Sequence, residues 1–252
     1  MRLVRLLLVG VAPLFFSSCV ILFNHPVNRF DSPEALGERW KAHFDAGLGG
    51  SNSVILTPNT DTTPVSSVSP SFERDDALTR LQFGLGILER LDFDIKGSLS
   101  SKEPVIVQAK YQLLGEPRAH AADGNFALAV TAGLGLMRGS GSGESTSTSP
   151  TRYDLHGSGV DAALIAGYRF NSAVSIYGGG FFTAFGYSGS QTLSTGTVSP
   201  FDGSSQQLGG NLGVDFGFER VRFKLEGAEG SVSAGGRSAQ EPYLGLLGSF
   251  FL

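Results

Sequence analysis

Residues 81–99 read LQFGLGILERLDFDIKGSL. Apolar residues stand at every second position on both sides of the dipeptide Glu89-Arg90: Leu81, Phe83, Leu85 and Ile87 before it, and Leu91, Phe93, Ile95 and Leu99 after it. A period of two indicates β-strands, because successive side chains of a strand point to opposite faces. The stretch therefore predicts two antiparallel strands joined by a tight turn, each with one apolar and one polar face.

The same alternation recurs along most of the chain. It predicts further strands over residues 40–48, 105–113, 126–136, 160–170, 173–187, 208–218, 221–227 and 243–252. The run Gly178-Gly179-Gly180 suggests a bulge in one of them, so that the register of residues 173–187 stays open. After Phe23 no apolar run reaches the roughly 18 residues that a transmembrane helix needs.

The lengths of the connections predict a topology. Short links fall at 89–90, 171–172 and 219–220, whereas long segments rich in Ser, Thr, Gly and Pro cover 50–76, 138–157, 188–206 and 230–241. Outer-membrane barrels have short periplasmic turns and long outer loops. The expected fold is therefore all-β, an antiparallel up-and-down transmembrane β-barrel of about ten strands (eight as the alternative), with both termini periplasmic. Two links depart from this rule, the short outer loop at 101–103 and the long periplasmic link at 114–124.

On this topology, outward aromatic residues gather at the periplasmic ends of the strands. They are Trp40, Tyr111, Phe126, Tyr168, Phe170, Phe216, Phe218 and Phe250. Such a girdle is typical of a barrel at a membrane interface. A soluble β-sandwich would also alternate, but it would not need its aromatic residues at one level.

Composition and charge narrow the function. The net charge is −4, and no run of Lys or Arg is present that would bind a phosphate backbone, which argues against nucleic acid as a partner. Cys19 is the single cysteine, so neither a disulfide framework nor a cysteine-ligated metal site can form within one chain. The four histidines lack metal-ligand spacing, and no cofactor is expected.

The N-terminus has the pattern of an export signal. Arg2 and Arg5 precede an apolar stretch that ends in small residues before Cys19. The segment Phe16-Ser17-Ser18-Cys19 resembles the bacterial lipoprotein cleavage box, which implies that Cys19 is lipidated and becomes the mature N-terminus. Ordinary signal-peptidase cleavage and an uncleaved anchor remain the alternatives. The expected division is a signal peptide at 1–18, a periplasmic segment at 19–37 and an outer-membrane barrel at 38–252.

The last ten residues read YLGLLGSFFL, apolar at alternate positions. This ending resembles the C-terminal sorting strand of Gram-negative outer-membrane proteins, and the hairpin at 81–99 looks like those of small outer-membrane barrels. The resemblance covers about residues 38–252. It implies the outer-membrane lipids and the barrel-assembly machinery as partners, and leaves any extracellular partner unknown.

The face opposite the apolar one carries charges, seven positive and six negative. These are Lys41, Asp45, Arg80, Asp92, Asp94, Lys96, Lys110, Asp161, Arg169, Asp215, Arg222, Lys224 and Glu226. Charges inside a narrow barrel must be paired or hydrated, so a balanced set is expected to neutralise itself across the strands. A polar passage for a small solute is the alternative.

Two short patterns suggest catalysis. Asp92 and Asp94, together with Asp154-Leu155-His156, resemble the paired acids and the Asp-x-His of omptin proteases, but the predicted topology separates them by most of a bilayer. His156-Gly157-Ser158 is similar to the His-x-Ser of outer-membrane lipid A deacylases, but no carboxylate can be assigned to orient the histidine. No catalytic residue is therefore expected.

The sequence thus predicts a non-enzymatic outer-membrane β-barrel with a structural or surface-interaction role and a lumen filled by side chains. A small-solute, porin-like channel is the alternative, and an outer-membrane lipid hydrolase is the third hypothesis.

Overall fold

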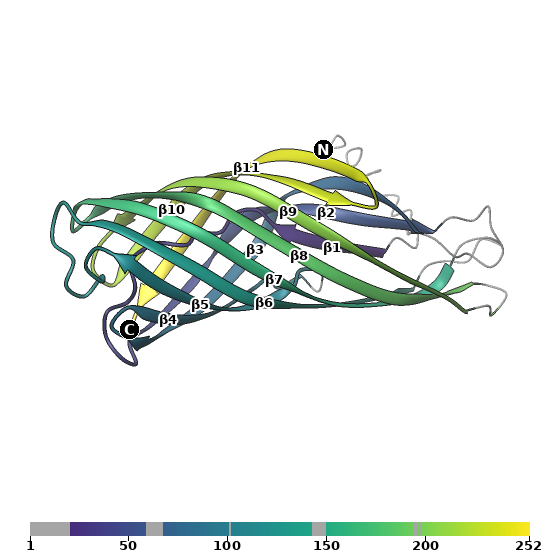
Figure 1. The fold of residues 1–252 in the computed structure, drawn as a ribbon, viewed down its shortest axis with the longest axis horizontal. Helices are drawn as coiled ribbons and strands as arrows, with labels where there is room; N and C mark the ends of the chain where they lie inside the picture. The colour runs from purple at the N-terminus through teal and green to yellow at the C-terminus, as the bar shows by residue number, and fades with distance from the viewer. Residues whose placement is uncertain (1–20, 59–67, 101, 143–149, 194–195, 197) are drawn as a thin grey trace, which may run out of the picture.

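The computed structural model describes residues 21–58, 68–100, 102–142, 150–193, 196 and 198–252, and it contains eleven strands (Figure 1). They are β1 (Ile21–Pro26), β2 (Ala42–Pro58), β3 (Val68–Leu88), β4 (Leu91–Gly97), β5 (Val105–Leu114), β6 (Phe126–Ser142), β7 (Pro150–Asn171), β8 (Val174–Leu193), β9 (Val198–Gly217), β10 (Val221–Ala234) and β11 (Arg237–Phe251). No helix in the described part of the chain is long and apolar enough to cross a membrane.

Strands β2 to β11 form a closed, antiparallel, up-and-down barrel. Each strand pairs with the next along the chain, and β2 pairs with β11 as well as β3. The predicted fold and the prediction of about ten barrel strands are therefore confirmed. The register of β8 with β9 runs without a break from Val174 to Thr192, so the three glycines at 178–180 make no bulge on that side.

The wall of the barrel is low on one side and tall on the other. Strands β4 and β5 have 7 and 10 residues, whereas β7, β8 and β9 have 22, 20 and 20. Much of what the sequence pattern assigns to long loops is in fact strand, including residues 150–157 and 198–206. The loop prediction is wrong there because a strand whose outward side chains are polar has the same composition as a loop.

The outward face carries an apolar belt. On β7 the exposed apolar side chains include Val160, Leu164, Tyr168 and Phe170. A strand rises about 3.3 Å per residue and tilts by about 40°, so the ten steps from Val160 to Phe170 span about 25 Å along the barrel axis. This height matches the apolar band of transmembrane barrels.

Beyond the belt, toward the end of the barrel where β8 meets β9, the pattern inverts. The outward positions there are polar, and the interior holds an apolar cluster of Ile21, Phe23, Val54, Leu56, Met137, Leu155, Phe185, Tyr187, Phe201, Val232 and Ala234. This part of the barrel, called the outer end below, has the apolar interior of a soluble protein. The opposite end, with the links 89–90, 172–173 and 218–220, is called the inner end.

The N-terminal segment lies inside the barrel. Of residues 21–37 only Leu22 and Ser32 are partly exposed, and the rest are buried. Ile21 pairs with Leu56 near the outer end of β2, and Leu36 contacts Asp92 at the inner end. Residues 21–36, called the luminal segment below, therefore run from the outer to the inner end, whereas the sequence analysis placed them in a separate periplasmic segment. The start of the described chain and the C-terminal strand end lie at opposite ends, which also differs from the expected topology.

A bulge in β2 makes room for β1. β11 pairs with β2 only from Leu246 to Phe251, and the register of β2 with β3 shifts between Gly49 and Ser51. Beyond this shift β1 pairs with Ser51–Leu56 of β2, which are buried on both faces. The outer half of β2 thus lies between β1 and β3, with which it pairs on its two edges.

The outer halves of β3 and β11 meet through side chains. Arg237 donates from Nη1 to the carbonyl oxygen of Pro70 at 3.1 Å, and Arg74 lies 3.9 Å from Glu241. Side chains thus bridge β3 and β11 beyond the point where β11 stops pairing with β2.

Candidate functional site

Most of the predicted charge network does face the lumen. Eleven of its thirteen residues are buried, namely Asp45, Arg80, Asp92, Asp94, Lys110, Asp161, Arg169, Asp215, Arg222, Lys224 and Glu226, and the Lys96 side chain is 13% exposed. Lys41 is the exception. It precedes β2, its side chain is 30% exposed, and its ammonium pairs with Glu38 at 3.5 Å. Its position at the strand start leaves it outside the lumen.

Some wall charges neutralise one another across neighbouring strands. Asp92 of β4 pairs with Lys110 of β5 at 3.0 Å, and Asp215 of β9 pairs with Arg222 of β10 at 2.6 Å. His43 lies between two carboxylates, with Nδ1 at 2.9 Å from Asp45 and Nε2 at 3.2 Å from Asp94. These contacts are of the kind expected for a self-neutralising wall.

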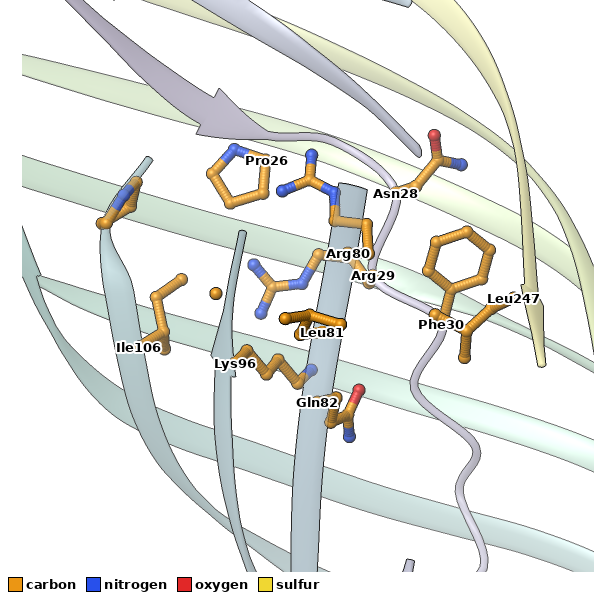
Figure 2. Close-up of a pocket in the computed structure, with 12 residues that line it drawn as sticks. Pro26, Asn28, Arg29, Phe30, Arg80, Leu81, Gln82, Lys96, Ile106 and Leu247 are labelled. Carbon is orange, nitrogen blue, oxygen red and sulfur yellow. The ribbon is translucent and has the colours of Figure 1, made fainter. Parts of the chain in front are cut away.

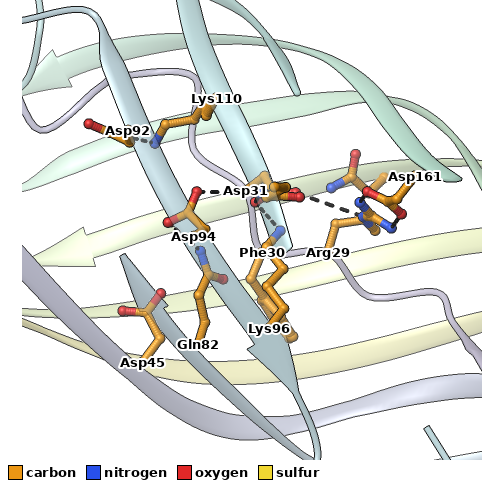
Figure 3. A network of polar contacts seen from close by, with 12 residues as sticks. Arg29, Phe30, Asp31, Asp45, Gln82, Asp92, Asp94, Lys96, Lys110 and Asp161 are labelled. Atoms are coloured by element: carbon orange, nitrogen blue, oxygen red, sulfur yellow. Dashed lines mark hydrogen bonds and ion pairs between the residues drawn. The ribbon is translucent and has the colours of Figure 1, made fainter. Parts of the chain in front are cut away.

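Other wall charges pair with the luminal segment instead, which the sequence analysis did not expect (Figure 3). Each of the three charged residues of that segment meets a wall residue of opposite sign: Arg29 with Asp161, Asp31 with Lys96, and Glu34 with Arg169. The partners belong to β7, β4 and β7. The segment is thus held by charge complementarity along its length.

The main chain of the luminal segment is also bound. Glu226 accepts hydrogen bonds from the backbone N–H groups of Arg29 at 2.6 Å and Phe30 at 2.8 Å. Lys224 donates to the carbonyl oxygen of Phe30 at 2.8 Å. Asn211 of β9 donates to Glu226 at 2.8 Å and so orients its carboxylate.

Further main-chain contacts hold the segment at the inner end. Lys110 donates to the carbonyl oxygen of Glu34 at 3.0 Å, and the backbone N–H of Ala35 donates to Gln112 at 2.7 Å. The N–H of Leu36 donates to both carboxylate oxygens of Asp92 at 3.1 Å. The wall therefore binds this extended peptide largely through groups that every peptide has.

The long link between β5 and β6 closes the inner end. The backbone N–H of Arg118 donates to the carbonyl oxygen of Ala35 at 2.8 Å, and its guanidinium lies 3.8 Å from the centre of the Phe251 ring. Burial lowers the pKa of Arg118 to about 10. The long link thus contacts both the luminal segment and the C-terminal strand.

At the outer end the contacts are neutral or come from the short loop between β4 and β5. His25 lies 3.2 Å from the Thr183 hydroxyl through Nδ1 and 2.8 Å from the Ser205 hydroxyl through Nε2. Glu103 of the loop accepts from Arg80 at 2.6 Å, and the N–H of Asn24 donates to the carbonyl oxygen of Lys102 at 2.9 Å.

Little space remains between the luminal segment and the adjoining wall (Figure 2). A cavity there of about 30 Å³ is lined by Pro26, Asn28, Arg29 and Phe30 of the segment and by Arg80 and Lys96 of the wall, among others. Such a volume holds one or two water molecules. Charged side chains and the segment together fill this part of the lumen.

The predicted aromatic girdle residues all face outward. All eight side chains are exposed and lie at or beside strand ends at the inner end of the barrel. They are Trp40, Tyr111, Phe126, Tyr168, Phe170, Phe216, Phe218 and Phe250. Phe126 pairs with Tyr168 across β6 and β7, and the Tyr168 and Phe170 rings are 5.1 Å apart. Cys19 lies outside the described residues.

The two catalytic patterns are not assembled as their resemblances would require. Asp92 and Asp94 point inward, whereas His156 is exposed on the outward face near the outer end. His156 Nε2 lies 2.9 Å from the hydroxyl of Ser188 on the neighbouring strand, and not of Ser158 as the resemblance would require. In the described part of the chain no group of three His, Cys, Asp or Glu side chains could hold a metal ion.

The sequence pattern did not identify Arg29, Asp31, Glu34 and Glu103 as lumen residues. The luminal segment reads VNRFDSPEAL over residues 27–36, with neither a period of two nor a helical period. Its charged residues were the available signal, since three charges in ten residues are more than the average of this chain, in which 17% of residues are charged.

No family model matches the chain, and no curated protein matches it. Among solved structures it is similar to Ail, the attachment invasion locus protein of Yersinia pestis, at 11% identity and a TM-score of 0.36, covering 85% of this chain and 99% of that one. Neisserial surface protein A matches at 13% identity and a TM-score of 0.30, over 84% of this chain and 96% of that one. At these TM-scores the likenesses carry no argument, and the barrel fold rests on the strand pairing.

Proposed function

We propose that the protein is a non-enzymatic β-barrel of the Gram-negative outer membrane whose lumen is closed by its own luminal segment. The observation that carries this proposal is the set of three ion pairs that join Arg29, Asp31 and Glu34 to Asp161, Lys96 and Arg169. A conducting channel would need a continuous aqueous path, and here a peptide and its partners occupy the lumen.

The outward face supports the location in a membrane. An apolar belt about 25 Å tall, with aromatic residues along its inner edge, suits a lipid layer and not water. The signal-like residues 1–18 and the C-terminal strand are the features that support export and assembly into the outer membrane. Such a closed barrel has a structural role, or it interacts with partners through its exposed outer end.

A bilayer recording tests the closed lumen. The purified protein should show little or no steady conductance, whereas the combined variant Arg29→Ala, Asp31→Ala, Glu34→Ala should show openings because all three ion pairs of the segment are lost. The matched control is Lys41→Ala together with Glu38→Ala, which removes an exposed ion pair outside the lumen. Openings in the unmodified protein would favour the small-solute channel, and a triple variant as silent as the control would contradict closure by these ion pairs.

Lipidation of Cys19 remains part of the proposal. Cys19→Ala should abolish labelling by a fatty-acid precursor, and unlabelled wild-type protein would remove lipidation while leaving the barrel.

One observation favours a lipid hydrolase as a second candidate. The hydrogen-bonded pair of His156 and Ser188 lies outward at the boundary between the apolar belt and the polar outer end. Lipid esters lie at this depth, and a histidine can activate a serine hydroxyl. The non-enzymatic proposal predicts no release of fatty acid from outer-membrane lipids by the purified protein. Release that Ser188→Ala abolishes, while Ser158→Ala does not, would reverse the order of the two candidates.

A further inference from the structure

We propose that the lumen is a binding site for an extended polypeptide segment, and that residues 21–36 are its resident ligand and not a fixed part of the wall. This inference rests on the proposed closure of the barrel. The juxtaposition that carries it is an open strand edge, a charged cradle and an aromatic socket, which follow one another along residues 21–36.

The open strand edge is the outer half of β2. Because β11 stops pairing with β2 at Leu246, the edge of Ser51–Leu56 is left for another strand, and β1 adds to it over six residues. Strand addition binds through main-chain hydrogen bonds and so accepts many sequences. This edge gives affinity for any extended peptide.

The charged cradle lies nearer the inner end than this edge, and it selects among peptides by their charges. It offers an anion, Asp161, and two cations, Lys96 and Arg169, to a peptide with a cation followed by anions two and five residues later. Glu226 holds the main chain beside the first charge, because it accepts the successive N–H groups of Arg29 and Phe30. A peptide shifted by one residue would place each charge away from its partner and leave buried charges unpaired.

The aromatic socket accepts the residue after the cation. Phe30 is 2% exposed and lies over two glycines. A Cβ at Gly245 would stand 2.5 Å from Phe30 Cζ, and a Cβ at Gly49 would stand 3.2 Å from its Cε2. Glycine at both positions therefore makes the space for the ring. The ligand class is an extended segment with a cation, an aromatic residue and an anion in succession.

The simpler alternative is that β1 is a permanent strand that folds once with the barrel. The two readings differ in whether the segment can be exchanged. The link before β2 allows the test, since Glu38, Arg39 and Trp40 are exposed and can accept a protease site.

The experiment starts from the full-length protein, purified and folded in detergent, with a protease site inserted between Glu38 and Arg39. After cleavage, a fluorescent peptide of residues 21–38 is added in excess, and its binding is followed by polarisation. The peptide should replace the excised segment. A peptide with Arg29→Glu should bind at least about tenfold more weakly, and Asp161→Lys in the barrel should restore its binding relative to the wild-type peptide.

Gly245→Ala should weaken binding of the wild-type peptide, whereas Gly248→Ala in the same strand should not, because the nearest atom to its added Cβ is 3.7 Å away. An excised segment that no excess of peptide displaces would overturn the inference, and so would binding that ignores the charge exchange. Conductance of the same nicked sample separates the proposals. A barrel that opens as its segment leaves but never binds the peptide would retain the proposed closure and lose the peptide site.

Discussion

Arg29 and Asp161, which are 132 positions apart in the chain, form a buried, bidentate ion pair. Arg29 Nη1 donates to Asp161 Oδ2 at 2.5 Å, Nη2 contacts Oδ1, and the two side chains are 2% and 0% exposed. The pair joins the luminal segment to β7.

The first prediction concerns the stability of this pair. Arg29→Ala or Asp161→Ala alone should lower the free energy of unfolding by about 3–5 kcal/mol, because each leaves an uncompensated buried charge. The double variant should lose less than the sum of the two. Urea unfolding in detergent measures the cycle. Additive losses would mean that the two side chains do not interact in the folded protein.

The second prediction concerns the packing beneath His43. Gly84 faces the lumen, and a Cβ there would stand 2.0 Å from His43 Nε2 and 2.3 Å from Asp94 Oδ1. Gly84→Ala should therefore cost about 1–3 kcal/mol of unfolding free energy through overpacking. Gly97→Ala is the control, since its nearest atom is 3.7 Å away. Equal stability of the two variants would show that the histidine is not held between its carboxylates.

The third prediction concerns orientation. An epitope inserted after Gly236, in the turn between β10 and β11, should be detected on intact cells, and so should one placed directly before Ile21. One inserted between Asn171 and Ser172 should need permeabilised cells. Detection of the epitope before Ile21 only after permeabilisation would contradict the direction in which the luminal segment runs.

Much of the barrel could be predicted from the sequence, because apolar and charged residues alternate along a strand that faces lipid on one side and a charged lumen on the other. Asp92, Phe93 and Asp94 show this directly, with the carboxylates buried and the ring exposed. The outer halves of the strands could not be predicted in this way. There the polarity inverts, as in β9, where Phe201 is buried and Asp202 exposed, so the pattern resembles a polar loop.

The occupant of the lumen could not be predicted, for a physical reason. Residues 27–36 take their shape from partners far away in the chain, such as Glu226 for Phe30 and Arg169 for Glu34. An extended peptide whose main chain is bound by side chains has no period of its own. Sequence therefore identified the charges of the wall but not the segment that several of them bind.

The most direct test of the closed barrel is a reversible lock on the segment. Ser53 donates to Asn24 at 2.7 Å across β1 and β2, so that Asn24→Cys with Ser53→Cys can be joined by a disulfide. In the variant that lacks the charges of Arg29, Asp31 and Glu34, the oxidised lock should suppress conductance across a bilayer. Reduction should restore the openings. A variant with only one of the two cysteines cannot form the lock, so its conductance should not be suppressed. Stable openings in the unmodified protein, or conductance that does not respond to reduction, would contradict the account.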